Sequence, residues 1–130
     1  MHRTQKIYSR NPTTRSKYCI DIRGNPFGEN QYATTSPCKK RPSQNFAYNR
    51  KSKQIRNKTT DKCLDLEPIQ RPIVQRKCNP KSKTQKWTRT KKHWKSSYDK
   101  MCLDIEAGQY NNGRLVSYKC HKGPNQKFSA

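Results

Sequence analysis

Six cysteines are the residues of this sequence whose types and spacing suggest the most definite chemistry. Cysteine side chains bind metals, act as nucleophiles or pair as disulfides. No Cys-x-x-Cys or Cys-x-x-His spacing occurs in the chain, so a zinc site is not indicated. The sequence therefore favours disulfides, with free thiols as the alternative, and disulfides imply an oxidising compartment.

The cysteines belong to a pattern that occurs three times. A Cys-x-Asp triplet is followed by a second cysteine, and then by a glutamine two residues before an aromatic residue. These glutamines, Gln44, Gln85 and Gln126, are 41 residues apart in both intervals. Because equivalent positions of a repeat should pair equivalently, the pattern selects one of the possible pairings. The predicted bridges are Cys19–Cys38, Cys63–Cys78 and Cys102–Cys120.

The elements that must position these residues are predicted to be short β-strands. Segments such as Cys19 to Ile22 alternate inward and outward side chains with a period of two, and turn signals such as Asn11-Pro12 and Asn112-Gly113 separate them. Ile55 and Trp94 each stand eight residues before a cysteine, as equivalent inward positions would. No segment has a sustained helical period, so we expect an all-β chain with about twelve strands.

Three equal units of this kind predict a β-trefoil, a six-stranded barrel capped by three hairpins. We expect one domain over residues 1–130, with repeats at about 1–47, 48–88 and 89–130. Each glutamine is predicted to bond backbone that barrel closure leaves unpaired. The predicted central layer is Phe46, Trp87 and Phe128, with Ile20, Leu64 and Leu103 beside it.

The net charge of +22, from 30 Lys and Arg against 8 Asp and Glu, is the outlying property of the composition. A surface of this kind attracts polyanions such as nucleic acid or sulfated glycans, and its alternative role is only to keep the protein soluble. Two basic hairpins are expected at one end of the barrel, with Trp94 in the core and not as a base-stacking platform. Their predicted polyanion contacts are Arg50, Lys51, Lys53, Arg56, Lys91, Lys92 and Lys95.

Signals for other classes of protein are weak. No run of 18 apolar residues is present, so no transmembrane segment is expected. The first twelve residues lack the apolar core of a signal peptide. We therefore expect either a secreted, extracellular protein whose signal was removed, or one that meets an oxidising setting in another way, for instance as a viral protein in a virion.

Catalysis is not expected. His2, His93 and His121 have no Ser or Cys partner pattern, and neither a phosphate-binding loop nor a metal cluster is apparent. We predict no enzymatic activity, no cofactor and no metal. The one N-glycosylation sequon, Asn57-Lys58-Thr59, is placed at a turn that we expect to be exposed.

The triple Cys-x-Asp … Cys … Gln-x-aromatic outline resembles the ricin B-chain-like lectin domain, from about Ile7 to Phe128. The resemblance implies one sugar site per repeat. Each site uses the Cys-x-Asp aspartate, an aromatic residue two positions before the second cysteine, and a polar residue, usually Asn, just before the glutamine. In this chain Lys or Asn stands inside the Gln-x-aromatic motifs, and Phe replaces Trp in two of them.

Carried over to this sequence, the first two sites lack the aromatic platform. The first unit offers Asp21, Ser36 and Ser43, and the second offers Asp65, Arg76 and Thr84. Arg76 would favour an anionic ligand. The resemblance therefore implies that the pockets at Asp21 and Asp65 are degenerate.

The third unit has the complete set, Asp104, Tyr118 and Asn125, with Val116 and His121 beside it. A carboxylate accepts two hydroxyl groups at once, a tyrosine ring packs on a pyranose face, and an amide both donates and accepts. The alternative is that the aspartate only closes a turn and that Tyr118 is ordinary strand surface.

The favoured function is a carbohydrate-binding, lectin-like module with one galactose-type pocket in the third repeat. The basic surface adds possible binding of a heparin-like glycan or of nucleic acid. The alternative is a non-enzymatic structural or polyanion-binding protein, such as a virion component with protein partners in a larger assembly, whose sugar pockets are vestigial.

Overall fold

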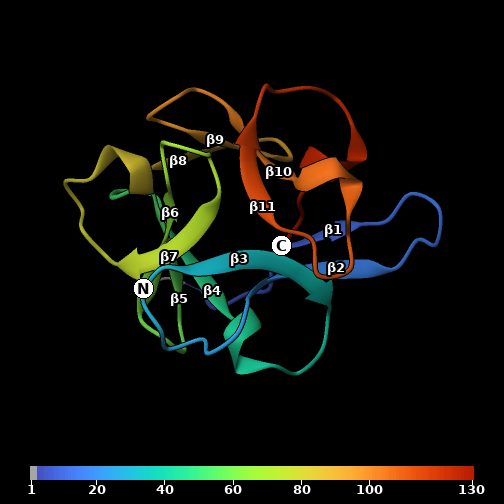
Figure 1. Ribbon diagram of the computed structural model, residues 1–130, viewed down its shortest axis with the longest axis horizontal. Coiled ribbons are helices and arrows are strands. Elements are labelled where there is room, and N and C mark those ends of the chain that lie inside the picture. Colours follow the sequence, from blue (N-terminus) through green and yellow to red (C-terminus); the bar gives the residue numbers. More distant parts are fainter. Residues whose placement is uncertain (1–2) are drawn as a thin grey trace.

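A computed structural model describes residues 3–130, and it contains eleven β-strands and no α-helix within that range (Figure 1). The strands are β1 (Tyr8–Arg10), β2 (Lys17–Ile22), β3 (Gln31–Pro37), β4 (Phe46–Asn49), β5 (Gln54–Asn57), β6 (Lys62–Leu66), β7 (Ile73–Lys77), β8 (Trp87–Thr90), β9 (His93–Ser96), β10 (Cys102–Ile105) and β11 (Leu115–Tyr118). Four 3-10 helices are η1 (Pro42–Gln44), η2 (Lys83–Gln85), η3 (Glu106–Gly108) and η4 (Pro124–Gln126). The all-β prediction is confirmed. His2 lies outside the described residues.

One strand fewer than expected is present, because the C-terminal segment forms only an isolated bridge, Tyr8 to Ser129. This segment nevertheless completes a ring with β1, β4, β5, β8 and β9. Three equivalent backbone bonds link the hairpins of the ring, each donated by the N–H of the aromatic residue of a Gln-x-aromatic motif. They run from Phe46 to Gln5, from Trp87 to Lys53 and from Phe128 to Lys92, at 2.9, 2.8 and 2.8 Å. The ring is the six-stranded barrel of a β-trefoil.

Three hairpins, β2–β3, β6–β7 and β10–β11, form the cap of the barrel. Strands β3, β7 and β11 lie around the centre of Figure 1 and bridge one another there. The bridges join Tyr32 to Val74, Thr34 to Arg114 and Pro72 to Val116. The turns between β4 and β5 and between β8 and β9 therefore lie at the opposite, open end of the barrel, because each barrel strand connects to the cap at its other end.

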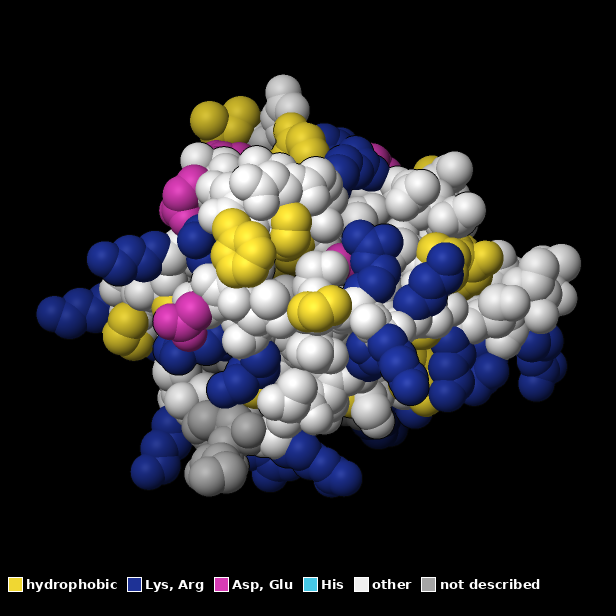
Figure 2. Space-filling view, turned by 90° about the horizontal axis from the view of Figure 1, so that it is seen from below, with side chains coloured by type: hydrophobic (Ala, Val, Ile, Leu, Met, Phe, Trp, Pro, Cys, Tyr) yellow, Lys and Arg dark blue, Asp and Glu magenta, His cyan; other side chains and the backbone are white. Residues whose placement is uncertain are grey.

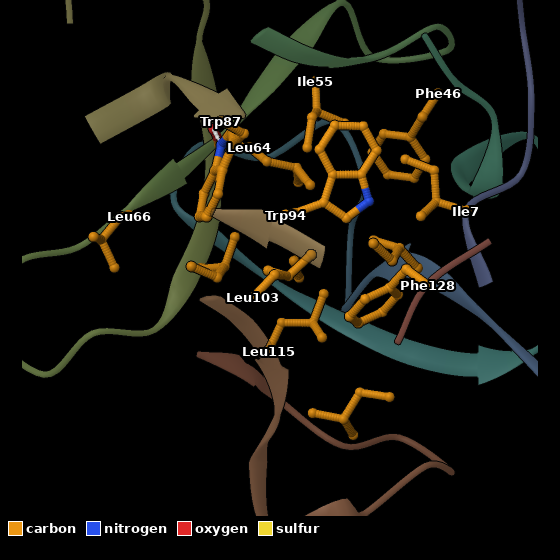
Figure 3. Close-up of a cluster of buried hydrophobic side chains, with 14 of the residues drawn as sticks. Ile7, Phe46, Ile55, Leu64, Leu66, Trp87, Trp94, Leu103, Leu115 and Phe128 are labelled. Atoms are coloured by element: carbon orange, nitrogen blue, oxygen red, sulfur yellow. Dashed lines mark hydrogen bonds between the residues drawn. The ribbon is translucent and has the colours of Figure 1, made fainter. Parts of the chain in front are cut away.

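The core lies on the axis of the barrel and beneath the cap. All six side chains of the predicted central layer are buried, none with more than 1% of its surface exposed. Ile55 and Trp94 are buried at equivalent positions of β5 and β9, as their spacing indicates. Figure 3 shows the indole ring of Trp94 among the other large side chains of this cluster.

The three predicted disulfides, one within each repeat, are confirmed. Each bridge joins the first strand of a cap hairpin to the chain just past its second strand. By the loop-entropy model a bridge of this loop length contributes roughly 3 kcal/mol to the free energy of unfolding. Bridges therefore compensate for a composition in which only 28% of residues are hydrophobic.

The repeated glutamines bond the cap hairpins and not the barrel backbone, which corrects the prediction. Gln85, 2% exposed, donates from Nε2 to Asp65 Oδ2 (3.1 Å) and to the carbonyl of Lys77 (3.0 Å), while its Oε1 accepts the N–H of Asn79 (2.8 Å). Lys77 and Asn79 flank the second cysteine of the repeat. The same three bonds recur at Gln44 and Gln126.

The glycosylation sequon is not at an exposed position, so that expectation is wrong. Asn57 is fully buried, and its Oδ1 accepts the N–H groups of Thr59 (2.9 Å) and Thr60 (3.1 Å). Its Nδ2 donates to the carbonyl of Ser43 at 2.9 Å. The amide closes the turn after β5 and is therefore unavailable for a glycan in the folded protein.

Replacing Gln85 by Ala should lower the free energy of unfolding by about 2–4 kcal/mol, because Asp65 and two backbone groups lose their buried partner. Chemical denaturation would measure the change. The matched control is Gln70→Ala, an exposed glutamine of the same repeat, with an expected effect within about 0.5 kcal/mol. Equal losses from both variants would show that the buried amide has no special role.

Candidate functional site

The predicted third-repeat residues come together at the edge of the β10–β11 hairpin. In its register Asp104 pairs with Val116 and Cys102 pairs with Tyr118, so alternation places the side chains of Asp104, Val116 and Tyr118 on one face. Tyr118 is 58% exposed, whereas Asp104 and Val116 are buried. An exposed aromatic ring therefore stands beside a largely buried carboxylate.

Two side-chain amides hold the Asp104 carboxylate in place. Asn125 Nδ2 donates to Oδ1 at 3.0 Å and Gln126 Nε2 donates to Oδ2 at 2.8 Å. An ionised carboxylate has about four acceptor positions, so about two remain for other donors. His121 Nε2 is a further 3.5 Å from Oδ2. The carboxylate is oriented by the fold without being saturated by it.

Asn125 and His121 are oriented by backbone contacts. Asn125 Nδ2 also donates to the carbonyl of Ile105 at 3.1 Å, so both of its amide hydrogens are used and its Oδ1 stays available as an acceptor. His121 Nδ1 accepts the N–H of Gly123 at 2.8 Å, which places the proton of the neutral ring on Nε2, facing Asp104. The His121 ring lies edge-on to Tyr118, with 6.3 Å between centroids.

Burial raises the pKa of the Asp104 carboxyl above its ordinary value, and this effect outweighs the opposing influence of the Gln126 and Asn125 hydrogen bonds and of the nearby His121. The ionised form of Asp104 is thus less favoured in the protein than it would be in water. Additional hydroxyl donors would stabilise it. The arrangement offers two carboxylate positions, one amide oxygen and one exposed ring face. Those groups suit a neutral polyol with an apolar face, which describes a pyranose sugar.

The first-repeat aspartate, Asp21, has no acceptor position left. Its Oδ1 accepts from Ser43 Oγ (2.6 Å) and the N–H of Ile22 (2.8 Å), and its Oδ2 accepts from Ser36 Oγ (2.7 Å) and Gln44 Nε2 (3.1 Å). Burial acts to raise the pKa of Asp21, but these four bonds outweigh it and lower the pKa. The two serines that replace Tyr118 and Asn125 therefore satisfy the carboxylate internally.

The second-repeat aspartate, Asp65, faces an arginine in place of an aromatic ring. Arg76 Nη1 is 3.7 Å from Asp65 Oδ2, while its Nη2 and Nε bond Glu67 Oε2 and Asn30 Oδ1, both at 2.6 Å. Asp65 Oδ1 is buried with no hydrogen-bond partner among residues 3–130. The guanidinium, fixed by two neighbours, belongs to the residue that pairs with Cys63 as Tyr118 pairs with Cys102 in the third repeat. Thr84, the polar position of this repeat, bonds Ser82 (2.9 Å between hydroxyls).

A cavity of about 460 Å³ adjoins the third-repeat site and shares Asn125 with it. Its other walls include the η3 turn at Ala107 and Gly108 and the β1–β2 turn at Asn11 to Thr13. Sequence reasoning identified Asn11-Pro12 only as a turn. Its position beside a site 100 residues later depends on the barrel contact of β1 with η4, in which Ser9 Oγ bonds the carbonyl of Pro124 at 3.0 Å.

Acidic residues are confined to one part of the molecule, whereas Lys and Arg occur in both the cap and the barrel. None of the eight Asp and Glu residues lies in β1, β4, β5, β8 or β9 or in the turns that join them. The predicted polyanion residues all belong to β4–β5 and β8–β9 or to their turns. Along the lower edge of Figure 2 the visible charged side chains are Lys and Arg, and the few visible Asp and Glu lie higher.

Within residues 3–130 no three His, Cys, Asp or Glu side chains are grouped as metal ligands. Over the same range no helix has the length and apolar character needed to cross a bilayer.

Comparisons with known proteins give one family. The model of the ricin-type β-trefoil lectin domain matches residues 7–128. Comparison with curated protein sequences gives no significant match.

Among solved structures, the C-half of an earthworm R-type lectin in complex with GalNAc is 24% identical, with a TM-score of 0.74 and coverage of 96% of this chain and 97% of that one. An agglutinin from Abrus precatorius is 17% identical, with a TM-score of 0.81 over 99% of this chain and 48% of its own. A mosquitocidal holotoxin gives a TM-score of 0.82 at 17% identity. The match covers 98% of this chain but only 17% of that toxin. At such identities the likeness establishes the fold. With the family model matched over nearly the whole length, the chain belongs to the ricin-type β-trefoil lectin domain family.

Proposed function

We propose that the protein is a lectin that binds a galactose-type sugar through one pocket, formed by Asp104, Val116, Tyr118, His121 and Asn125. The observation that carries this proposal is the difference in hydrogen bonding among the three equivalent aspartates. Asp104 alone combines unused acceptor positions with an exposed aromatic neighbour, whereas Asp21 is saturated and Asp65 faces Arg76. The GalNAc bound by the earthworm lectin is consistent with a galactose-type ligand.

A single shallow site should bind a monosaccharide weakly, with a dissociation constant on the order of millimolar, because such a ligand buries little surface. Useful avidity would then need a second contact, either multivalent presentation of the sugar or attraction between the basic surface and an anionic surface that carries the sugar. Three disulfides fit action in an oxidising, extracellular setting.

Replacing Tyr118 by Ala should reduce galactoside binding at least about tenfold, because the stacking surface is lost while the buried frame is untouched. Isothermal titration, or a glycan array with the same sugar, would measure this. The matched control is Tyr98→Ala, which removes a tyrosine of similar exposure (51%) outside the site. Asp104→Asn should also abolish binding. Equal losses at Tyr98 and Tyr118, or no binding of any neutral glycan by the unmodified protein, would contradict the proposal.

Galactoside affinity should fall with acid, starting at a pH above the ordinary aspartate pKa of 3.8, because burial raises the pKa of Asp104 and only its ionised form accepts two hydroxyls. Titrations at decreasing pH, with circular dichroism at each pH, would follow binding and folding separately. Asp21, whose pKa is lowered, stays ionised over this range and keeps the first repeat intact. Affinity that stays constant down to pH 3.8 would exclude Asp104 as the acceptor.

A second function, binding of polyanions, is proposed from the charge division. The barrel strands and their turns have Lys and Arg but no Asp or Glu, and of the predicted polyanion residues only Arg56 pairs with an acid among the described residues, Asp61 at 3.2 Å, so most of the positive field is not neutralised locally. A heparin-like glycan or nucleic acid would be bound through counterion release, without base-specific contacts, since Trp94 is only 2% exposed.

Replacing Arg50, Lys51, Lys53 and Arg56 together by Gln should flatten the dependence of log affinity on log salt for heparin or DNA. Each DNA phosphate neutralised contributes a slope of about −0.9, so the expected change is up to about four such steps. Asp104→Asn is the control, because it should remove sugar binding and leave the salt slope unchanged. Polyanion affinity that does not vary with salt would contradict this proposal. The basic surface would then be only a solvated face or a contact for another protein.

A further inference from the structure

A second cavity, of about 1120 Å³, opens at the end of the barrel opposite the cap. The residues around it come from the segment before β1, from β4 and the turn that follows it, from β8 and β9, and from the C-terminal segment, whereas the sugar-site hairpin belongs to the cap. Its volume is slightly above the usual range of about 300–1,000 Å³ for small-molecule sites. The residues that give it its chemistry are Arg3, Tyr48, Arg50, Lys51, Arg89 and Trp94.

The charged side chains that line this cavity are all basic. No Asp or Glu side chain lines it, and among the described residues no ion pair joins Arg3, Arg50, Lys51 or Arg89 to an acid. Like charges at one opening repel each other, and an anion between them would relieve the repulsion. The cavity therefore favours an anionic ligand over a cationic one.

Two buried donors in its wall have no acceptor. Arg89 Nη2 donates to the carbonyl of Phe128 at 2.7 Å, but Nη1 is buried and has no hydrogen-bond partner within residues 3–130. Trp94 Nε1 is likewise buried and unpaired, and its ring lies 4.6 Å from the Arg89 guanidinium carbon. Burial without a counter-charge lowers the pKa of Arg89. Buried donors are almost always paired, so two unpaired donors on residues that line one cavity are unusual, although both atoms lie behind its surface.

We propose that this cavity binds the sulfate group of a sulfated glycan, with Arg89 at its base and Arg3, Arg50 and Lys51 at its rim. The inference rests on the proposed binding of polyanions and deepens it, since it replaces a diffuse surface by a defined site. A sulfate ester is a pendant group with three terminal oxygens, and it can enter a cavity while its saccharide remains at the opening. The phosphate of a nucleic-acid backbone lies within the chain with only two, and no exposed ring here could stack its bases.

The two tryptophans provide an internal test, because Trp87 Nε1 already donates to the carbonyl of Leu64 at 3.2 Å (Figure 3). In NMR titrations of the intact protein at constant ionic strength, a heparin tetrasaccharide should shift the Trp94 indole and Arg89 side-chain resonances. It should leave the Trp87 indole unchanged. Sodium sulfate should produce the same shifts at higher concentration, and sodium chloride should not.

Variants separate this site from general attraction. Arg50→Gln with Lys51→Gln should weaken tetrasaccharide binding at least about tenfold, whereas Lys91→Gln with Lys95→Gln, which removes equal charge from a neighbouring hairpin outside the lining, should change it less than about twofold. Arg89→Lys keeps the charge but loses the planar fork, and should also weaken binding.

Heparin binding with equal losses in both double variants and no change at Trp94 would leave only diffuse attraction, and the defined site would be wrong. Shifts with sulfate alone, or stronger shifts with an oligodeoxythymidylate of equal charge than with the tetrasaccharide, would overturn the sulfated-glycan assignment. Galactoside binding should be unaffected in every variant, so failure here is distinct from failure of the sugar pocket.

Discussion

Each buried glutamine of the Gln-x-aromatic motif donates from Nε2 to the aspartate of its own repeat and to a carbonyl just before the second cysteine. Its Oε1 accepts an N–H just after that cysteine. The cap hairpin, the disulfide and the start of the next barrel strand therefore meet at one amide group. The aromatic residue two positions later enters the core, where its N–H closes the barrel. The aspartate, the carbonyl and the N–H of each cap hairpin would lose this hydrogen-bond partner without the amide. The contact therefore fixes the cap on the barrel in all three repeats.

The same contact explains why an aspartate in every repeat is not a sugar site in every repeat. The glutamine occupies one position on each carboxylate, and the side chains around it decide what happens to the others. In the first repeat two serine hydroxyls and a backbone N–H fill them, and in the second an arginine held by Glu67 approaches instead. In the third, one asparagine bond leaves positions unused beside an exposed ring. A structural aspartate is thus adapted for binding only where its other partners are few.

The division of charge follows from the same architecture. Acidic residues are confined to the cap hairpins and the loops that flank them, where most of them pair with basic residues, including Asp61 with Arg56 of β5. The charged residues of the barrel strands and their turns are all basic, and Arg3, Arg50, Lys51 and Arg89 converge at the open end because trefoil topology brings the chain's start, its end and the turn after β4 there. The proposed sugar pocket and the proposed anion site are therefore at separate ends, and one large ligand or two different ligands could engage both.

Repeat spacing and residue type in the sequence determined the fold class, the three disulfides and the central core layer. These features depend on periodicity, which is a property of the chain itself: equivalent positions in a 41-residue repeat must occupy equivalent environments. The residues of the third-repeat site could also be predicted from the sequence, but only because the resemblance to a lectin family assigns a role to each position.

The tertiary structure decided what depends on contacts between distant segments. It showed that the glutamines bond the cap and the aspartates, that the sequon asparagine Asn57 is buried, and that the Asn11 turn borders the third-repeat site. It also placed Arg89 in the wall of a cavity. Arg89 begins the second predicted basic hairpin but is not among the predicted polyanion contacts, although a period of two from Trp87 puts it on the inward side of β8. Whether a carboxylate is saturated with hydrogen bonds, and whether charges converge at an opening, depends on which residues are neighbours in space. Residue spacing along the chain does not reveal those neighbours.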